Sequence, residues 1–165
     1  MVLVVMGVSG SGKTTVAAIL ARRLGWPFEE GDALHPQANI RKMMEGRPLT
    51  DGDRAPWLEA VAAWVRARLD AGEDGIITCS ALKRRYRDVI AGHRGGVTFI
   101  LLAGSREMIA SRLAGRSGHF MPPSLLDSQF ADLEAPSPGE PVLTFDIAAP
   151  ADVIAQEVID TLKLG

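Results

Sequence analysis

The chain has 165 residues, of which 47% are hydrophobic and 23% are charged, and its formal net charge is −2. This composition is typical of one globular domain over residues 1–165 and excludes a disordered chain. The small negative charge gives no general attraction to nucleic acid or to an anionic membrane, so neither is expected as a partner. Cys79 is the one cysteine, which leaves no intrachain disulfide and favours a reducing, cytoplasmic location.

Strand-like and helix-like segments alternate along the chain. Short, continuous apolar runs are typical of strands covered on both faces, and they predict strands at residues 2–6, 75–79 and 97–102. Two further strands are expected at residues 27–31 and 142–147. Helical spacing of apolar residues predicts helices at about 16–24, 36–45, 51–72, 83–91, 106–114, 123–133 and 151–162. Asp51 or Asp53 is expected to cap the third helix. This alternation predicts a three-layer α/β fold with a five-stranded parallel sheet and ligands at the carboxyl ends of the strands.

A glycine-rich segment joins the first expected strand to the first expected helix. Residues 7–14 read GVSGSGKT and match the G-x-x-x-x-G-K-[ST] pattern of a P-loop nucleoside triphosphatase fold. In such a loop the backbone amides and the helix N-terminus face phosphates, Lys13 bridges the β- and γ-phosphates of ATP, and the Thr14 hydroxyl binds Mg²⁺. A turn that only joins a strand to a helix needs neither side chain. The expected ATP-binding residues in this segment and directly after it are Gly7, Val8, Ser9, Gly10, Ser11, Gly12, Lys13, Thr14 and Thr15.

The rest of the sequence indicates which class of P-loop protein this chain resembles. The Asn-Lys-x-Asp segment expected of a GTPase is absent, and an ATP-driven motor normally exceeds this length. A small-molecule kinase is therefore favoured. A nucleotide-binding regulatory module without turnover is the alternative from another class.

Five further blocks resemble the gluconokinase family in order and spacing. They are GDALHP at 31–36, NIRKM at 39–43, PLTDGDRAPWL at 48–58, CSALK at 79–83 and GHFM at 118–121. The resemblance covers essentially the whole chain. It implies a nucleoside-monophosphate-kinase-like fold of the shikimate-kinase-like branch, ATP and Mg²⁺ as cofactors, D-gluconate as the substrate phosphorylated to 6-phospho-D-gluconate, and a homodimer. Another acceptor, such as shikimate, adenylylsulfate or a nucleoside monophosphate, is the nearest alternative.

An acceptor-binding flap is expected at about residues 35–72, and it contains most of the acceptor candidates. Asp32, at the end of the second expected strand, is a candidate to hold the acceptor hydroxyl, support the metal or accept a proton, although aspartate also suits a turn. His35 is a candidate for a gluconate hydroxyl or for capping the next helix. Arg41 and Arg54 are candidates to clamp the acceptor carboxylate, since a guanidinium presents paired donors; the alternative for each is a solvated helix charge.

Residues after the third expected strand give further candidates. Lys83 follows a buried strand and is a candidate acceptor contact. Its alternative is membership of an exposed basic run with Arg84, Arg85 and Arg87. Gln129 is a weaker acceptor candidate. Trp57, Trp64 and Cys79 are interpreted as packing residues.

A lid is expected at about residues 112–123. Arg112 and Arg116 lie four positions apart, which places them on one helix face if the helix continues that far. Arg112 is expected to contact adenine or phosphate, and Arg116 the charge that develops on the transferred group. A basic helix end that complements the helix dipole is the alternative. His119 is a candidate substrate contact on closure, or an exposed loop residue.

Overall fold

One parallel sheet organises the molecule. The computed structural model describes residues 1–115 and 123–165. The strands are β1 (Val2–Met6), β2 (Phe28–Glu30), β3 (Gly75–Thr78), β4 (Val97–Ala103) and β5 (Val142–Asp146), all parallel, in the order β2-β3-β1-β4-β5. The predicted five-stranded parallel sheet is confirmed, with strand ends within two residues of those expected.

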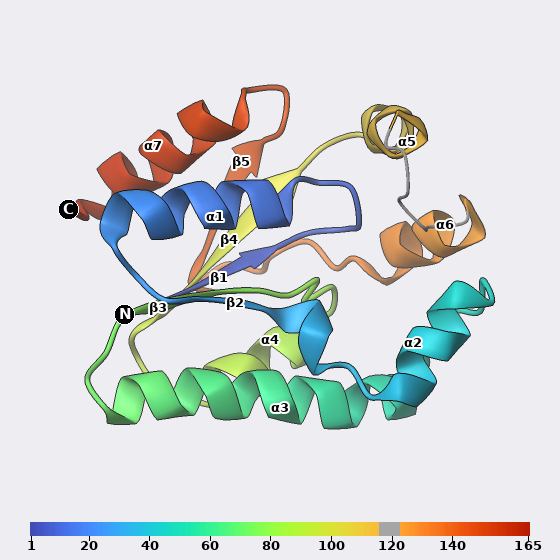
Figure 1. The fold of residues 1–165 in the computed structure, drawn as a ribbon, viewed down its shortest axis with the longest axis horizontal. Helices are drawn as coiled ribbons and strands as arrows, with labels where there is room; N and C mark the ends of the chain where they lie inside the picture. The colour runs from blue at the N-terminus through green and yellow to red at the C-terminus, as the bar shows by residue number, and fades with distance from the viewer. Residues whose placement is uncertain (116–122) are drawn as a thin grey trace.

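Helices cover both faces of this sheet and one of its ends (Figure 1). They are α1 (Lys13–Leu24), α2 (Gln37–Met44), α3 (Asp51–Asp70), α4 (Arg84–Ala91), α5 (Arg106–Ala114), α6 (Pro123–Asp132) and α7 (Ala151–Leu162). In Figure 1, α1 and α7 lie on one face and α3 and α4 on the other, while α2, α5 and α6 lie beyond the carboxyl ends of the strands. No helix in the described part of the chain is long and apolar enough to span a bilayer.

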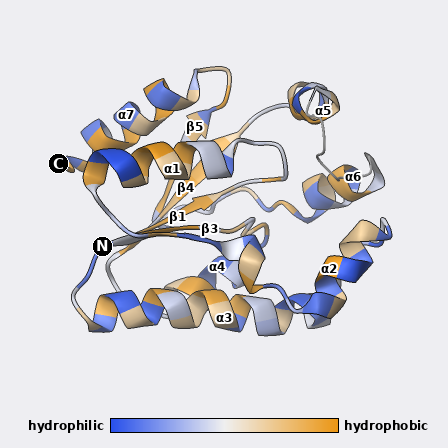
Figure 2. Cartoon of the chain, viewed as in Figure 1, coloured by the Kyte–Doolittle hydropathy of each residue, from blue (hydrophilic) through white to orange (hydrophobic). Residues whose placement is uncertain are grey.

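The central strand β1 explains why its sequence is a continuous apolar run. All five of its residues are buried. Leu3 and Val5 belong to the core cluster that includes α1 and α7, whereas Val4 and Met6 belong to the cluster that includes α3 and α4. Alternate side chains of a strand point to opposite faces, so a strand between two helical layers needs apolar residues at every position. The inner strands β1 and β4 are accordingly drawn largely in orange, the hydrophobic colour, in Figure 2.

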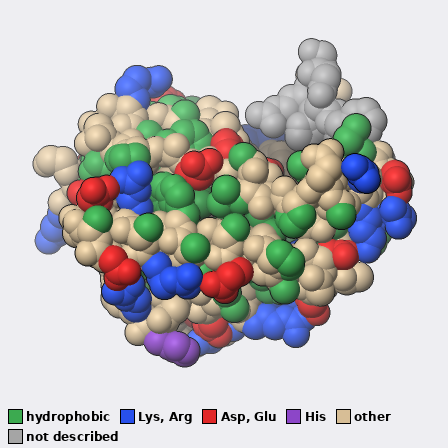
Figure 3. Space-filling view, turned by 60° about the horizontal axis from the view of Figure 1, so that its bottom comes forward, with side chains coloured by type: hydrophobic (Ala, Val, Ile, Leu, Met, Phe, Trp, Pro, Cys, Tyr) green, Lys and Arg blue, Asp and Glu red, His purple; other side chains and the backbone are tan. Residues whose placement is uncertain are grey.

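The molecular surface mixes charges of both signs. On the face shown in Figure 3, acidic and basic side chains are interspersed with apolar ones. This mixture agrees with the small net charge of the sequence. That face therefore offers no extended patch of one sign.

Helix α3 begins differently from the prediction. Thr50, not Asp51 or Asp53, is the N-cap: its Oγ1 accepts from the Asp53 backbone amide at 3.1 Å, and the Asp53 carboxylate accepts from the Thr50 amide at 2.8 Å. This reciprocal pair is a capping box, in which the acidic residue occupies the third helical position. The prediction was wrong because Asp53 satisfies the amide of the cap rather than acting as the cap. The helix ends at Asp70, before Gly72.

A one-turn 3₁₀ helix, η1 (Gly31–Leu34), follows β2 and carries Asp32. The strand therefore ends at Glu30, one residue earlier than expected. Gly31 approaches β3 so closely that a Cβ atom there would lie 1.9 Å from the Thr78 carbonyl oxygen. Trp57 Nε1 also donates to the Gly31 carbonyl at 2.8 Å. Only glycine fits at position 31. This close approach holds η1, the turn that carries Asp32, against the sheet.

Arg87 corrects the expectation of an exposed basic run on α4. Its side chain is 1% exposed and forms an ion pair with the 3% exposed side chain of Glu140, with 2.8 Å between Nε and Oε1. Arg87 Nη1 also donates to the carbonyl oxygens of Ala81 and Leu82 at 3.0 and 3.1 Å. The arginine thus ties α4 to the loop after β3 and to the loop before β5. Sequence spacing does not reveal this role because its partner lies 53 residues away.

Replacing Arg87 with leucine is expected to lower the free energy of unfolding by about 3–5 kcal/mol, because it leaves the Glu140 carboxylate buried without its cation. Urea denaturation measures this change. Arg94→Leu is the matched control, since it breaks an exposed pair with Asp70 and is expected to cost about 1 kcal/mol or less. Equal losses in the two variants would contradict the role assigned to Arg87.

Protonation of Glu140 provides a second test of the same pair. The hydrogen bond from Arg87 holds the pKa of Glu140 below its ordinary value of 4.5. A lowered folded-state pKa contributes stability above the unfolded-state value, and that stability is lost as the pH falls. The double variant Arg87→Leu/Glu140→Leu should therefore lose less stability than wild type on acidification.

Candidate active site

The P-loop turns sharply at the carboxyl end of β1. Gly7, Gly10 and Gly12 have φ angles of 145°, 81° and 95°, which side chains other than glycine rarely adopt. Helix α1 then begins at Lys13, whose Nζ donates to the carbonyl oxygens of Gly7 and Val8 at 2.9 and 3.1 Å. Burial lowers the pKa of Lys13, while the nearby Asp32 carboxylate acts in the opposite direction. The lysine is therefore held inside the curve of the loop.

A cleft of about 240 Å³ opens over this loop. Its walls are Ser9, Gly10, Gly12, Lys13, Thr14, Glu30 and Asp32. Thr14 and Thr15 are exposed at the start of α1, whereas the loop residues Gly7, Val8 and Ser11 are buried. The cleft combines a cationic side chain, two hydroxyls and two carboxylates at the N-terminus of a helix, which is a suitable environment for phosphates and a divalent cation.

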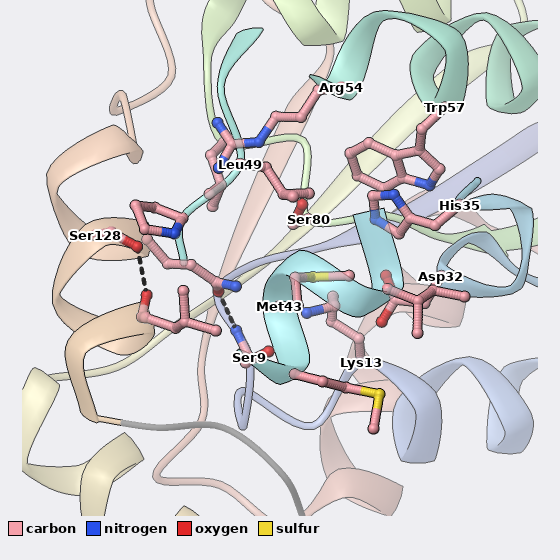
Figure 4. Close-up of a pocket in the computed structure, with 16 residues that line it drawn as sticks. Ser9, Lys13, Asp32, His35, Met43, Leu49, Arg54, Trp57, Ser80 and Ser128 are labelled. Carbon is pink, nitrogen blue, oxygen red and sulfur yellow. Dashed lines mark hydrogen bonds between the residues drawn. The ribbon is translucent and has the colours of Figure 1, made fainter. Parts of the chain in front are cut away.

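A second cavity, of about 260 Å³, adjoins the cleft (Figure 4). We call it the acceptor pocket, and its walls come from six segments: Ser9, Lys13, Asp32, His35, Ile40, Met43, Met44, Pro48, Leu49, Arg54, Trp57, Ser80, Leu82, Leu125, Ser128 and Gln129. Ser9, Lys13 and Asp32 line both cavities. The phosphate cleft and the acceptor pocket therefore meet at one serine, one cation and one carboxylate.

Arg54 supplies a second cation to the acceptor pocket. It is 7% exposed, and its Nη1 donates to the Tyr86 hydroxyl and to Asp132 Oδ2, each at 2.9 Å. Within residues 1–115 and 123–165, its Nε and Nη2 atoms make no hydrogen bond to protein. One nitrogen anchors the guanidinium, and the other two are available to a ligand.

His35 and Trp57 form another part of the pocket wall. Their rings stack with centroids 4.1 Å apart and planes inclined by 15°. Trp57 is buried in the core, so its predicted packing role is confirmed, but the same ring also supports His35 (Figure 4). Trp64 packs against the same core cluster, as predicted.

Other predicted residues lie outside the acceptor pocket. Arg41 is exposed on α2, and Lys83 donates to Asp51 at 3.0 Å. Neither lines the pocket. Arg112 borders a separate hollow beside the P-loop, together with Gly10, Gly12 and Thr15, and its guanidinium donates to the Ile147 carbonyl. Arg116 and His119 lie outside the described residues, as does most of the predicted lid.

The site also contains Gln129, which the sequence analysis undervalued, and Glu30, which it missed. The Gln129 side chain accepts from the Ser9 amide at 2.7 Å, which ties α6 to the P-loop across 120 positions of sequence. Glu30 lines the phosphate cleft, and its buried Oε1 has no hydrogen-bond partner in the described chain. Glu30 ends β2, so the rule that ligands bind at the carboxyl ends of strands would have found it. No local signal marks Gln129.

Cys79 takes no part in this chemistry. It is buried at the end of β3, and burial raises the pKa of its thiol to about 12. A thiol with so high a pKa stays protonated and is a poor nucleophile. The prediction that Cys79 is a packing residue is confirmed.

A P-loop at the carboxyl edge of a parallel sheet, joined to an acceptor pocket, defines a kinase that acts on a small molecule. A family model described as an AAA domain matches residues 2–136. The gluconokinase of Gluconobacter oxydans is 54% identical over 157 residues, covering 95% of this chain and 88% of that protein. The chain belongs to this AAA-domain family and to the gluconokinase family.

Solved structures agree with this assignment. A sugar kinase from Janibacter sp. superposes with a TM-score of 0.94 at 49% identity, covering 99% of this chain and 95% of the other. A gluconokinase from Sinorhizobium meliloti superposes with a TM-score of 0.87 at 48% identity, covering 98% and 90%. The predicted family and the predicted fold class are both confirmed.

Proposed function

We infer that this protein transfers the γ-phosphoryl group of ATP to D-gluconate, forming ADP and 6-phospho-D-gluconate. The observation that carries this proposal is the meeting of the phosphate cleft and the acceptor pocket at Lys13 and Asp32. Phosphoryl transfer needs little covalent chemistry from the protein, which mainly aligns the acceptor oxygen and neutralises phosphate charge. A cation and a carboxylate at the junction suit those two tasks. The gluconokinases among the relatives support the choice of acceptor.

The nucleotide side of the proposal uses the P-loop and α5. The loop amides and Lys13 are positioned for the phosphates, and Arg112, Thr15 and Gly12 border the hollow where the nucleoside would continue. Arg112 is thus assigned to ATP binding. Arg116 remains assigned to the charge on the transferred group and His119 to the acceptor, both within the proposed lid at 112–123.

The residues in the cleft fit Mg²⁺. Mg²⁺ prefers oxygen ligands and keeps several waters, and the cleft presents the Thr14 hydroxyl, the Asp32 carboxylate and the unpartnered Glu30 Oε1. Thr14 would hold the ion directly, with Glu30 and Asp32 acting through water. The bound ion would supply charge neutralisation for the phosphates.

The acceptor side uses the proposed flap at 35–72 together with α6. The free nitrogens of Arg54 are the best-placed donors for the gluconate carboxylate, because the guanidinium is buried, anchored and faces the pocket. Asp32 orients or deprotonates the 6-hydroxyl, and His35 contacts another oxygen of the acceptor. Arg41 and Lys83 are weaker acceptor contacts in this geometry.

D-Gluconate is expected to be phosphorylated at least about 10²-fold more efficiently than glucose, because a neutral sugar offers no carboxylate to the Nε and Nη2 atoms of the buried Arg54 guanidinium. ADP release with gluconate, glucose, shikimate, adenylylsulfate, a nucleoside monophosphate or no acceptor measures this preference. Equal efficiency with glucose would remove the acid-specific site. ATP binding without acceptor-dependent ADP release would favour the regulatory module instead.

Two arginine variants locate the carboxylate clamp in the same assay. Arg54→Met should raise KM for gluconate strongly and reduce the preference over glucose. Arg41→Met removes an exposed guanidinium from the same flap and should have the smaller effect. A larger effect of Arg41→Met than of Arg54→Met would instead assign the carboxylate clamp to Arg41 on α2.

Two further parts of the proposal concern the protein as a whole. A homodimer rests on the resemblance to gluconokinases, and light scattering of the purified protein tests it. A cytoplasmic location is supported by the single thiol, which is free and buried.

A further inference from the structure

A buried asparagine contacts the histidine of the acceptor pocket. Asn39 lies on α2 and is 4% exposed. Its Nδ2 atom is 2.8 Å from the Asp53 carbonyl oxygen and 3.2 Å from His35 Nδ1. Both contacts are made by the same nitrogen.

The Asp53 carbonyl determines which way the Asn39 amide is turned. A backbone carbonyl only accepts hydrogen bonds, so the amide atom beside it must be the NH₂ group. The second hydrogen of that group is directed to His35 Nδ1. A nitrogen that accepts a hydrogen bond carries a lone pair, and in neutral imidazole the proton must then be on Nε2.

The surroundings of the ring agree with a neutral form. Stacking on Trp57 fixes the plane of the imidazole. Burial lowers the pKa of His35 from its ordinary value of 6.5; the charged groups that act on it are Asp32 on η1, which opposes this effect, and Arg54 on α3, which adds to it. In the part of the chain that the structure describes, Nε2 has no hydrogen-bond partner.

We propose that Asn39 is a positioning residue that fixes His35 as a neutral imidazole with its proton on Nε2. His35 then donates a hydrogen bond to an acceptor oxygen and does not serve as the general base. Asp32 is the one carboxylate among the described residues of the pocket wall, so the proton of the reacting hydroxyl falls to Asp32. The donation to an acceptor rests on the proposed function, whereas the tautomer does not.

Nitrogen-15 NMR of the full-length wild-type protein tests the tautomer directly. The sequence has three histidines, and His35→Gln identifies the signals of His35 by their loss. At neutral pH, His35 Nδ1 is expected at the chemical shift of an unprotonated nitrogen and Nε2 at that of a protonated one. A protonated Nδ1 would overturn the proposal, whether or not the protein phosphorylates gluconate.

Adding D-gluconate tests the donation. The Nε2 signal of His35 is expected to shift, while Nδ1 stays unprotonated. An unchanged Nε2 signal in a protein that phosphorylates gluconate would overturn the donation. If the tautomer is as expected but gluconate neither binds nor reacts, the proposed function fails and the role of Asn39 stands.

Asn39→Asp tests the positioning role by reversing the hydrogen bond. A carboxylate accepts from Nδ1–H, so the proton should move to Nδ1 and the titration midpoint of His35 should rise by about one unit or more. Above that midpoint the Nε2 donor is lost and KM for gluconate should rise roughly tenfold; below it both nitrogens are protonated and KM should recover. KM for ATP should not change. A structural defect alone would raise KM at every pH, and that result would overturn the role of Asn39.

Two controls complete the experiment. Gln37→Glu adds the same charge at an exposed position two residues away and is expected to leave the His35 tautomer unchanged. His35→Gln keeps an N–H donor near the position of Nε2, whereas His35→Asn does not, so the glutamine variant should retain the lower KM for gluconate. Should Asn39→Asp fail to fold, the wild-type spectrum still decides.

Discussion

Lys13→Ala is expected to lower turnover at saturating ATP and gluconate by about 10²–10³-fold, the effect typical of removing one group that stabilises charge in a transition state. Lys13 lines both the phosphate cleft and the acceptor pocket, so its ammonium is expected to act on the group in transfer. Alanine leaves that charge without a fixed counterpart. Steady-state ADP release measures the loss, and direct ATP binding to the same variant separates ground-state from transition-state effects.

The fold should survive this substitution. The side-chain hydrogen bonds of Lys13 are to two carbonyl oxygens of its own loop, and it is not a member of either core cluster. Arg22→Ala is the matched control, because it removes the same charge from an exposed position on α1 and should keep turnover within about twofold. Near-normal turnover by Lys13→Ala would refute the chemistry assigned to the P-loop.

Asp32→Asn is expected to lower turnover by about 10²–10⁴-fold if the carboxylate takes the proton from the 6-hydroxyl. Asparagine keeps an oxygen that can orient the hydroxyl but is not basic. Asp32→Ala removes both functions. Comparing the two variants therefore divides the contribution of Asp32 between proton transfer and orientation.

Glu157→Gln, on the exposed face of α7, is the control for loss of one carboxylate and should leave turnover unchanged. A large loss in Asp32→Ala with a small one in Asp32→Asn would make Asp32 an orienting group only. Turnover near the wild-type rate in both would reduce Asp32 to a turn residue, and the junction of the two cavities would then lack its assigned base.

The local sequence was sufficient to predict the helices, the strands and the P-loop side of the site. Apolar runs predicted the three inner strands β1, β3 and β4, because a strand between two helical layers must be apolar on both sides. The P-loop was recognisable because its glycines, Lys13 and Thr14 act within eight consecutive residues. Arg87 and the cap of α3 were misjudged for opposite reasons. Arg87 pairs with Glu140, which lies far away in the sequence. The cap of α3 was instead misassigned between near neighbours, since Thr50 and not Asp53 is the N-cap.

The sequence by itself determined the parallel α/β fold, the phosphate-binding loop and the family of the protein, because these depend on short-range periodicity and on contiguous motifs. Only the tertiary structure decided which candidates share a pocket. It brought Asp32, His35, Arg54 and the weaker candidate Gln129 together with Lys13, left Arg41 and Lys83 outside, and added Glu30. The tautomer of His35 likewise depends on a carbonyl from another helix. Contacts between segments distant in sequence depend on strand order and packing, which no local pattern encodes.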